Sequence, residues 1–369
     1  SIRKPQICFL PQVVSPVALT RRRFGIRGFP DCCSSRGRHP LQKAEVKISF
    51  TVPWRTRLHA VETAWALNDD ISERKGSMSS FIRLGAFLNG SGPHGGIWRH
   101  EHIDTEALGT FAYYCKLAKR LQDGKFDVLF MNDTISAGLF EPDLIEKNTA
   151  ATRWDTLTLL AGLSVVTDRI GLVGTANTTY NEPFTLARRL ESLDRLSEGR
   201  AGWNVVTSLE GGENYNRDDH VLHATRYERA EEFVDVVLGL FDSWDDGAAI
   251  KDKASGRWFD AARVKLLNYR GKHFQVRGPL NAPRPVQGWP VIAQAGSSEA
   301  GRRLAARIGE LIFTAATTIE EGRTFRKEIR EKAEREFGRN PDHLLIMPGV
   351  SVTVAETREE AEAKFDRLH

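Results

Sequence analysis

The sequence predicts an α/β protein built from repeated strand–helix units, and three observations support that prediction. Short apolar runs alternate along the chain with longer segments in which apolar residues recur at helical spacing. One run, FDVLFMND at residues 126–133, has the near-continuous apolar character of a parallel strand that is covered on both faces. Polar residues follow the runs directly, as Thr178 and Thr179 follow the run that starts at residue 170. Because ligands collect at the carboxyl ends of parallel strands, these polar residues predict a binding site there.

From residue 81 onward the alternation is regular enough to assign the elements in order. The expected strands cover residues 82–88, 126–133, 170–177, 201–207, 290–296, 310–315 and 344–354. The expected helices cover residues 105–121, 154–167, 184–196, 226–241, 298–308, 319–337 and 357–368. In the first helix the apolar residues recur at helical spacing, at Leu108, Phe111, Ala112, Cys115 and Ala118. The third helix has clear limits, since Pro183 suits a first helical turn and Gly199 suits the position just past a helix end.

The alternation stops after the fourth helix. Residues 243–288 form a long polar segment that contains a hairpin-like run, VKLLNYRGKHFQV, and a minimal strand–helix repeat has no place for them. We expect this segment to be an insertion over one end of the sheet.

Seven strand–helix units are compatible with a parallel sheet, and eight would close a barrel. A doubly wound open sheet is the alternative. However, the loop GSGPHGG at residues 90–96 lacks the GxGxxG spacing of a dinucleotide-binding loop. Asp133 ends the second strand, where such a fold has its ribose-binding acid, but without the phosphate loop before it the match is weak. The sequence favours a TIM-type (β/α)8 barrel that lacks its eighth β/α unit, with a long insertion after the fourth helix. On this interpretation the domain is truncated at its C-terminal end, which leaves two strand edges open.

Composition limits the class of protein but does not identify its chemistry. The chain has 41% hydrophobic and 27% charged residues, which is ordinary for a globular protein, and no apolar run approaches the roughly 18 residues of a membrane span. No spacing of cysteine and histidine suggests a zinc site or a structural disulfide. We therefore expect a reduced, cytoplasmic protein with no metal and no membrane partner.

The net charge of +4 is unevenly distributed along the chain. Residues 1–77 hold 14 Lys and Arg against 6 Asp and Glu, whereas residues 78–369 hold 38 against 42. The mildly acidic body has no nucleic-acid footprint. Residues 1–44 show no sustained helix or strand period, and three interpretations of residues 1–77 stay open: a basic extension such as translated upstream sequence, an organellar targeting peptide, or an arm that binds nucleic acid or membrane. We expect the folded domain to occupy residues 78–369.

Several long stretches of the body resemble one enzyme family. They are GIWR (96–99), KFDVLFMND (125–133), the block TTYNEPFTLARRLESLDRLSEGRAGWNVVTS (178–208), RYERAEEF (226–233) with SWDD (243–246), RGPLNAPRPVQGWPVIAQAGSSEAG (277–301) and LIMPGVSVTVAETREEA (345–361). On these stretches the chain resembles the bacterial-luciferase-like flavin monooxygenases, in the branch of nitrilotriacetate monooxygenase component A and dibenzothiophene-sulfone monooxygenase.

The resemblance implies a two-component monooxygenase. Such an enzyme takes reduced FMN from a separate NAD(P)H-dependent flavin reductase and uses O2 to oxidise a small organic substrate. The cofactor then supplies the difficult chemistry, and the protein binds, orients and excludes water. The resemblance also implies that two copies of the chain pair as a homodimer. A deazaflavin-dependent oxidoreductase of the same superfamily and an inactive truncated remnant are the alternatives.

The resemblance assigns flavin contacts to residues at strand ends and helix starts. The cofactor-binding residues it implies are Asp133, Thr178, Thr179, Asn204, Thr207, His223, Tyr227, Ser297 and Ser298. Each has a structural alternative: Asp133 as a helix cap, the threonines as strand packing, and the two serines as plain N-caps. His223 and Tyr227 are spaced i, i+4 and face one way on a helix, and His223 is the candidate for acid–base catalysis. For Ser297 and Ser298 the helix start adds backbone N–H groups, which suit a phosphate.

The substrate cannot be identified from the sequence, but two regions bear on it. His94 and Trp98 in the first loop are candidates for the substrate side of the site. The insertion at residues 243–288 is expected to decide between substrates, and its cations would suit an anionic one, although a solvated surface explains them equally well. These cations are Arg257, Arg263, Lys265 and Lys272.

Overall fold

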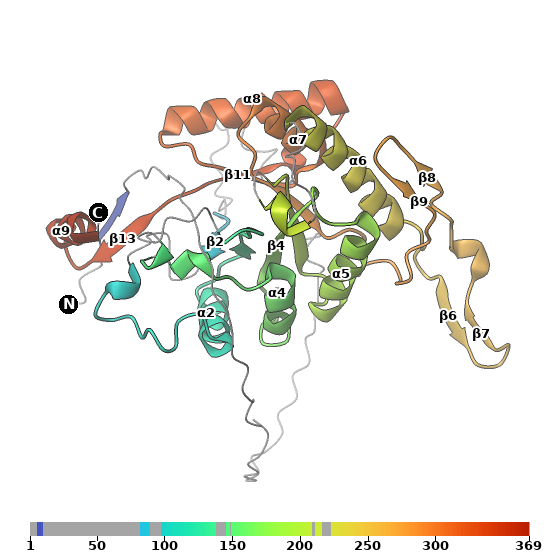
Figure 1. Ribbon diagram of the computed structural model, residues 1–369, viewed down its shortest axis with the longest axis horizontal. Helices are drawn as coiled ribbons and strands as arrows, with labels where there is room; N and C mark the ends of the chain where they lie inside the picture. Colours follow the sequence, from blue (N-terminus) through green and yellow to red (C-terminus); the bar gives the residue numbers. More distant parts are fainter. Residues whose placement is uncertain are drawn as a thin grey trace, which may run out of the picture.

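At the centre of the molecule lies a parallel sheet of seven strands, with helices around it (Figure 1). The computed structural model describes residues 6–9, 82–88, 97–137, 145–147, 149–208, 211–215 and 223–368. The seven strands are β2 (Gly85–Leu88), β3 (Val128–Met131), β4 (Gly171–Asn177), β5 (Ala201–Val206), β10 (Val291–Gln294), β11 (Leu311–Thr314) and β12 (Leu345–Pro348).

The order of strands in the sheet follows their order along the chain, from β2 through β3, β4, β5, β10 and β11 to β12. A doubly wound sheet reverses direction at a switch point, and this sheet does not. Its two edge strands, β2 and β12, approach each other through side chains, since a Cβ on Gly85 would lie 3.1 Å from Met347 Cε. The ring of Phe87 on β2 also lies 6.1 Å from the ring of Phe313 on β11, the neighbour of β12. The sheet is therefore a nearly closed barrel of seven strands, which confirms the predicted partial TIM barrel.

The alternation of side chains along each strand separates two apolar cores. The interior of the barrel is filled by a small cluster, which consists of Val128, Phe130, Val173, Val291, Ala293 and Leu311. Here Gly202 on β5 has to be a glycine, because a Cβ would lie 2.7 Å from Val173 Cγ2. Outward-facing residues such as Leu129, Leu172 and Trp203 pack against the helices in a larger core.

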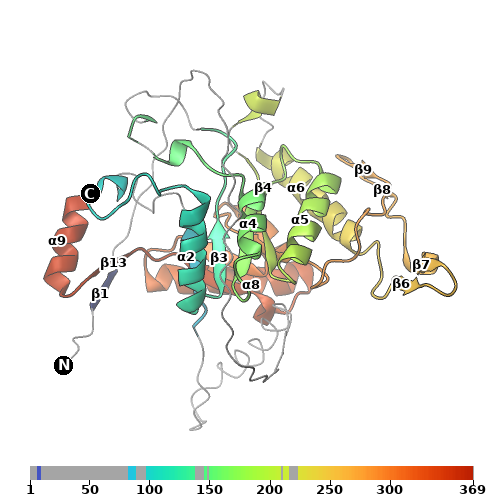
Figure 2. The ribbon, with the colours of Figure 1, turned by 90° about the horizontal axis from the view of Figure 1, so that it is seen from below.

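Consecutive helices contact one another around the sheet, and Figure 2 shows α2, α4 and α5 side by side. The helices are α2 (Phe111–Asp123), α4 (Thr156–Ser164), α5 (Pro183–Leu196), α6 (His223–Phe241), α7 (Glu299–Ile308), α8 (Ile319–Phe337) and α9 (Arg358–Leu368). Short 3-10 turns are η1 (Ile97–Arg99), η2 (Thr149–Ala151), η3 (Gly212–Tyr215), η4 (Ala261–Arg263) and η5 (Pro341–His343). Among the described residues, no helix is long and apolar enough to cross a membrane.

The starts of α2 and α4 differ from the predicted starts because of their caps. The hydroxyl oxygen of Thr110 accepts from the amide of Tyr113 at 3.2 Å, so α2 begins at Phe111 rather than at residue 105. Asp155 caps α4 in the same way, at 2.8 Å from the amide of Thr158. Periodicity alone cannot distinguish the preceding turns from the helix proper.

The prediction of one strand over residues 344–354 is wrong. β12 ends at Pro348, which lacks the N–H that would continue a ladder, and a separate strand, β13 (Val352–Ala355), follows. β13 pairs antiparallel with β1 (Gln6–Phe9), and α9 packs against these two strands at the side of the barrel (Figure 1). β1 comes from residues 1–77, of which the structure describes no other part, so the division into an extension and a domain at residue 78 stays a prediction.

The insertion after α6 forms two hairpins. β6 (Ala249–Asp252) pairs with β7 (Arg257–Phe259), and this hairpin projects from the barrel (Figures 1 and 2). β8 (Tyr269–Arg270) pairs with β9 (Gln275–Val276). The end of the insertion lies at the amino ends of the strands, since Gln287 Nε2 donates to the carbonyl of Ala201, the first residue of β5, at 2.8 Å.

Four of the nine Lys and Arg residues of the insertion, the ones named from the sequence, have acidic partners. The ion pairs are Arg257–Asp260, Arg263–Asp260, Lys265–Asp245 and Lys272–Glu228. Each of these four cations has an ion-pair partner, although Arg257 and Arg263 share Asp260, and this favours the solvated-surface interpretation of the four side chains. A role of the insertion in substrate choice stays a prediction.

Candidate functional site

The polar residues that follow the strands gather at the carboxyl ends of β3, β4, β5 and β10. They come from four chain segments, at residues 132–133, 177–179, 207–208 and 297–298. Because the strands are parallel and adjacent in the barrel, these segments meet at one end of it. Within the described residues, no group of three or more His, Cys, Asp or Glu side chains is arranged to hold a metal ion.

Asn204 is the polar residue deepest in this end of the barrel. It is 3% exposed and lies on the inner face of β5, where its Nδ2 donates to Thr175 Oγ1 on β4 at 2.8 Å. Its Oδ1 is buried and accepts no hydrogen bond from any described residue. Leaving a buried acceptor unpaired costs about 1–3 kcal/mol. A ligand with an N–H or O–H donor would remove this cost, so the interior suits a polar ligand such as a flavin ring.

Thr178 and Thr179 are buried, and their hydroxyls already join the loops after β4 and β5. Thr178 Oγ1 donates to the carbonyl of Val206 at 3.3 Å, and Thr179 Oγ1 accepts from the amide of Ser208 at 3.2 Å. These hydrogen bonds give both hydroxyls a partner within the protein, so neither needs a ligand. Thr207, half-buried between the two loops, follows the end of β5.

Two arginines of α6 hold the same loops from outside. Arg226, 8% exposed, donates from Nη1 to the carbonyl of Ser208 at 3.0 Å, and its Nε has no partner among the described residues. Arg229 donates to the carbonyl of Thr178 and lies over the ring of Phe274, 4.5 Å from its centroid. Neither arginine was predicted from the sequence, although both belong to the RYERAEEF stretch on which the resemblance rests.

Asp133 follows β3 beside a half-buried arginine. Arg153 Nη1 donates to Asn132 Oδ1 at 2.9 Å, and its charge also acts on Asp133 and Tyr114. Burial, helped by the nearby charge of Asp155, raises the pKa of Asp133 to about 6. The Thr134 amide and Arg153 oppose this shift. Asp133 can thus change its charge near neutral pH, as polar groups in binding sites often do. Arg153 lies in a loop with no periodicity, so the sequence offered no signal for it.

The start of α7 lies against Tyr227 of α6. Ser298 Oγ accepts from the amide of Gly301 at 3.1 Å and lies 3.4 Å from the hydroxyl of Tyr227. Ser297 is exposed. The loop approaches the helix closely, since a Cβ on Gly296 would lie 2.8 Å from Gly301 Cα. The structure therefore brings Tyr227 and Ser298 together, and Ser298 acts as an N-cap at least.

The remaining candidates are placed less completely. His223 is the first residue of α6, one turn before Tyr227. Trp98 is half-buried in η1, and its Nε1 donates to the carbonyl of Lys147 at 3.0 Å, which gives it a structural role. His94 lies outside the described residues, as does the side chain of His223.

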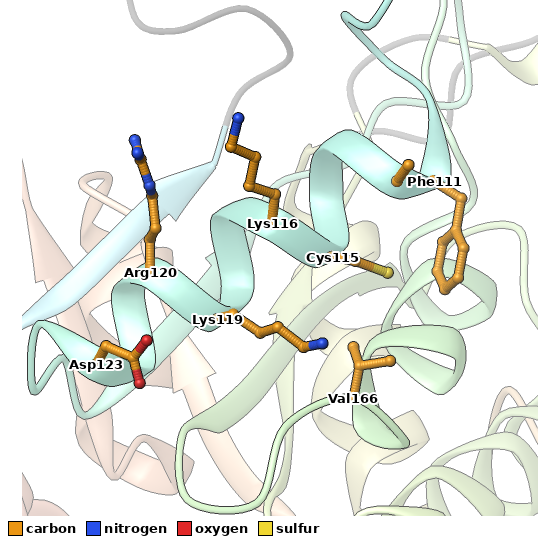
Figure 3. A pocket seen from close by; sticks show the side chains of 8 residues that line it. Phe111, Cys115, Lys116, Lys119, Arg120, Asp123 and Val166 are labelled. Carbon is orange, nitrogen blue, oxygen red and sulfur yellow. The ribbon is translucent and has the colours of Figure 1, made fainter. Parts of the chain in front are cut away.

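A pocket of about 660 Å³ lies elsewhere, on the outer surface of α2 (Figure 3). Phe111, Cys115 and Val166 form its apolar part, and Lys116 and Lys119 lie around it. None of the predicted site residues lines it. The pocket is therefore a surface groove that is separate from the strand ends.

Comparisons with known proteins identify the family. The family model described as "Luciferase-like monooxygenase" matches residues 93–369, and the chain belongs to this family. It is 47% identical over 289 residues to N-acetyl-S-(2-succino)cysteine monooxygenase of Bacillus subtilis (strain 168), which covers 78% of this chain and 64% of the relative. It is 44% identical over 296 residues to nitrilotriacetate monooxygenase component A of Aminobacter aminovorans, which covers 78% and 65%. The chain thus spans slightly less than two thirds of the length of these relatives.

Solved structures agree with the fold. Long-chain alkane monooxygenase superposes with a TM-score of 0.74 at 33% identity, over 79% of this chain and 69% of that one. Riboflavin lyase, solved with modified FMN and riboflavin, superposes with a TM-score of 0.73 at 33% identity, over 78% and 66%.

Proposed function

We propose that this protein is a flavin-dependent monooxygenase that uses reduced FMN and O2 to oxidise a small organic substrate. Membership of the luciferase-like monooxygenase family supports the reaction class. The observation that carries the proposal within this chain is the unpartnered Asn204 Oδ1, which lies inside the barrel at the end where the other predicted flavin contacts gather.

In this proposal the polar strand ends hold the flavin. Asn204 and Asp133 offer acceptors to the ring system or the ribityl chain. The start of α7, with Ser297 and Ser298, offers backbone N–H groups and hydroxyls to the phosphate, and Tyr227 adds a hydroxyl beside Ser298. Reduced FMN would supply the electrons that activate O2. The chain's own residues bind and orient the flavin and keep water out of the barrel.

Four further residues are proposed flavin contacts with weaker support: Thr178, Thr179, Thr207 and His223. The two buried hydroxyls already bond to the backbone, so they shape the loops around the flavin first. An acid–base role of His223 and a substrate-side role of Trp98 and His94 rest on the resemblance.

The partner that this function requires is a flavin reductase. A relative that is 44% identical is named component A, and two others, at 39% and 35% identity, are named as different subunits of pristinamycin IIA synthase. These names imply that the relatives work with further components. We propose that this chain likewise receives reduced FMN from a separate NAD(P)H-dependent reductase, and that it pairs as a homodimer.

A deazaflavin-dependent oxidoreductase is the second interpretation, and no observation favours it. The solved structures whose titles name F420 are 15% identical to this chain, which shows a shared fold only.

The test is a titration of the purified chain with FMN, followed by quenching of flavin fluorescence, with circular dichroism to show that the sample is folded. We expect saturable binding, and weaker binding by Asp133→Asn. Oxygen uptake with a flavin reductase, using nitrilotriacetate and N-acetyl-S-(2-succino)cysteine as probes, then tests the reaction. A folded chain that binds no flavin would contradict the proposal and favour the inactive remnant.

A further inference from the structure

Thr175 lies beside Asn204 inside the barrel and has two hydrogen-bond partners. The two residues are in register on adjacent strands, and Thr175 is 4% exposed. Its Oγ1 lies 2.8 Å from the carbonyl oxygen of Met131 on β3 and 2.8 Å from Asn204 Nδ2 on β5. One hydroxyl group thus links three neighbouring strands.

This arrangement fixes which way the amide of Asn204 points. A hydroxyl has a single hydrogen, and a carbonyl oxygen can only accept, so the hydrogen of Thr175 goes to Met131 O. Thr175 Oγ1 can then only accept from Asn204, which requires Nδ2 on its side. If the amide were flipped, two oxygens without a hydrogen would face each other. Asn204 Oδ1 is therefore held away from Thr175 as an acceptor without a described partner.

The other neighbour of Asn204 in the sheet offers nothing to this oxygen. On the β10 side the residue in register is Ala293, whose side chain cannot donate. The apolar residues of the interior cluster, such as Val173 and Val291, cannot donate either. Asn204 Oδ1 is thus an acceptor on the inner face of the sheet that its neighbours in the sheet leave for a ligand.

We propose that Thr175 is a positioning residue that holds Asn204 Oδ1 as an acceptor for a flavin N–H, so that the site favours reduced over oxidised FMN. Reduction adds a hydrogen at N5 of the isoalloxazine ring and converts an acceptor into a donor. Because Thr175 keeps the amide of Asn204 from flipping, Oδ1 would pair with the N5–H of reduced FMN, whereas it would face the lone pair on N5 of oxidised FMN. The inference rests on the proposed function, because it takes flavin as the ligand.

The experiment compares the dissociation constants of oxidised FMN and of dithionite-reduced FMN under anaerobic conditions. Wild type should bind the reduced form more tightly. In Thr175→Val, which keeps the shape but removes the hydroxyl, the preference should fall by about tenfold. Thr175→Ser, which keeps the hydroxyl, should retain it. Asn204→Leu removes the acceptor itself and should lose the preference to the same extent.

Each outcome decides the matter. A preference that is unchanged in either Thr175→Val or Asn204→Leu would overturn the inference, as would equal binding of the two forms by wild type. In the latter case flavin binding, and with it the proposed function, would stand. Binding of neither form would overturn both. If Thr175→Val does not fold, as circular dichroism would show, Thr175→Ala, which also removes the hydroxyl, takes its place in the comparison.

Discussion

Two aspartates at opposite ends of the barrel, one buried and one half-buried, share a raised pKa but differ in their surroundings. Asp194 lies at the amino end and is fully buried, and burial raises its pKa to about 6. Four donors oppose this shift and hold the carboxylate: Gln287 Nε2 at 2.5 Å, the Gln287 amide at 3.3 Å, the Ala201 amide at 3.4 Å and the Val286 amide. Asp133 at the carboxyl end also has a pKa of about 6, but among the described residues the Thr134 amide is the one donor that opposes the shift through a hydrogen bond.

The two ends differ in which polar groups are fully paired. At the amino end Arg200, 7% exposed, has every donor occupied. Its partners, at 2.7–3.0 Å, are Ser164 O, Thr167 O, Thr167 Oγ1, Ile170 O and Ser197 O. Among the described residues, Gln287 Oε1 and Arg83 Nε stay unpaired at the amino end, and Asn204 Oδ1 and Arg226 Nε stay unpaired at the carboxyl end. Because parallel barrels bind ligands at the carboxyl ends of their strands, we infer that Asn204 Oδ1 is kept for a ligand, and that Arg200 and Asp194 at the amino end maintain the fold.

The largest expected effect comes from the amino end. Arg200→Met leaves up to five buried acceptors without a donor, so the free energy of unfolding should fall by about 4 kcal/mol. Urea denaturation measures it. Arg169→Met is the matched control, since Arg169 is an exposed arginine paired with Asp168, and it should change stability by less than about 0.5 kcal/mol. A loss in Arg200→Met as small as in the control would contradict the assignment of this end to stability.

The pH dependence of stability tests Asp194. Its pKa is raised from 3.8 to about 6 in the folded protein, so the folded state binds more protons than the unfolded state between these values. The contribution of Asp194 to the free energy of unfolding therefore falls by up to about 3 kcal/mol as the pH rises from about 4 to 6, and it does not change further above about pH 6. The difference in unfolding free energy between wild type and Asp194→Asn, measured by denaturation from pH 4 to 8, isolates this group. A difference that does not vary with pH would show that Asp194 does not titrate in this range.

At the carboxyl end Asp133→Asn should affect the ligand and not the fold. Loss of a charged acceptor should weaken FMN binding by about tenfold, whereas the free energy of unfolding should not fall. For wild type the affinity should rise as pH increases through about 6, because the carboxylate then accepts hydrogen bonds, and the variant should lose this component. Asp194→Asn, tested without denaturant at a pH of about 7, serves as the control with unchanged affinity. Equal effects of the two substitutions on affinity would remove the contrast between the ends.

The smallest expected effect concerns the start of α7. Ser298→Ala removes an N-cap and should cost about 1 kcal/mol of stability. If the phosphate binds here, Ser298→Ala together with Ser297→Ala weakens binding of FMN but leaves binding of riboflavin, which has no phosphate, nearly unchanged. Equal losses for both flavins would assign the two serines to capping only.

The pattern of residues predicted the barrel better than it predicted the roles of single side chains. Seven apolar runs and the caps around them define the strands and helices, because burial on both faces leaves a clear signal, as in β4. The end of β12 at Pro348 and the departure of β13 depend on pairing with β1, a contact between distant parts of the chain that periodicity does not encode.

The same limit applies to the site. The sequence located Asp133, Asn204 and Ser298 at strand and helix ends, where the structure has them. It could not tell that the hydroxyls of Thr178 and Thr179 are taken by neighbouring backbone, or that the cations of the insertion are ion-paired, because partners depend on register and side-chain direction. Thr175 was hidden within a strand, although an inward-facing threonine in an otherwise apolar run is a signal that alternation can reveal.

A crystal structure of the chain with bound FMN tests the central claim most directly. We predict the isoalloxazine ring at the carboxyl ends of the strands, with a ring nitrogen within hydrogen-bond distance of Asn204 Oδ1 and the phosphate at the start of α7. FMN bound only in the groove on α2 around Phe111 and Cys115, or ordered at neither place, would contradict this claim.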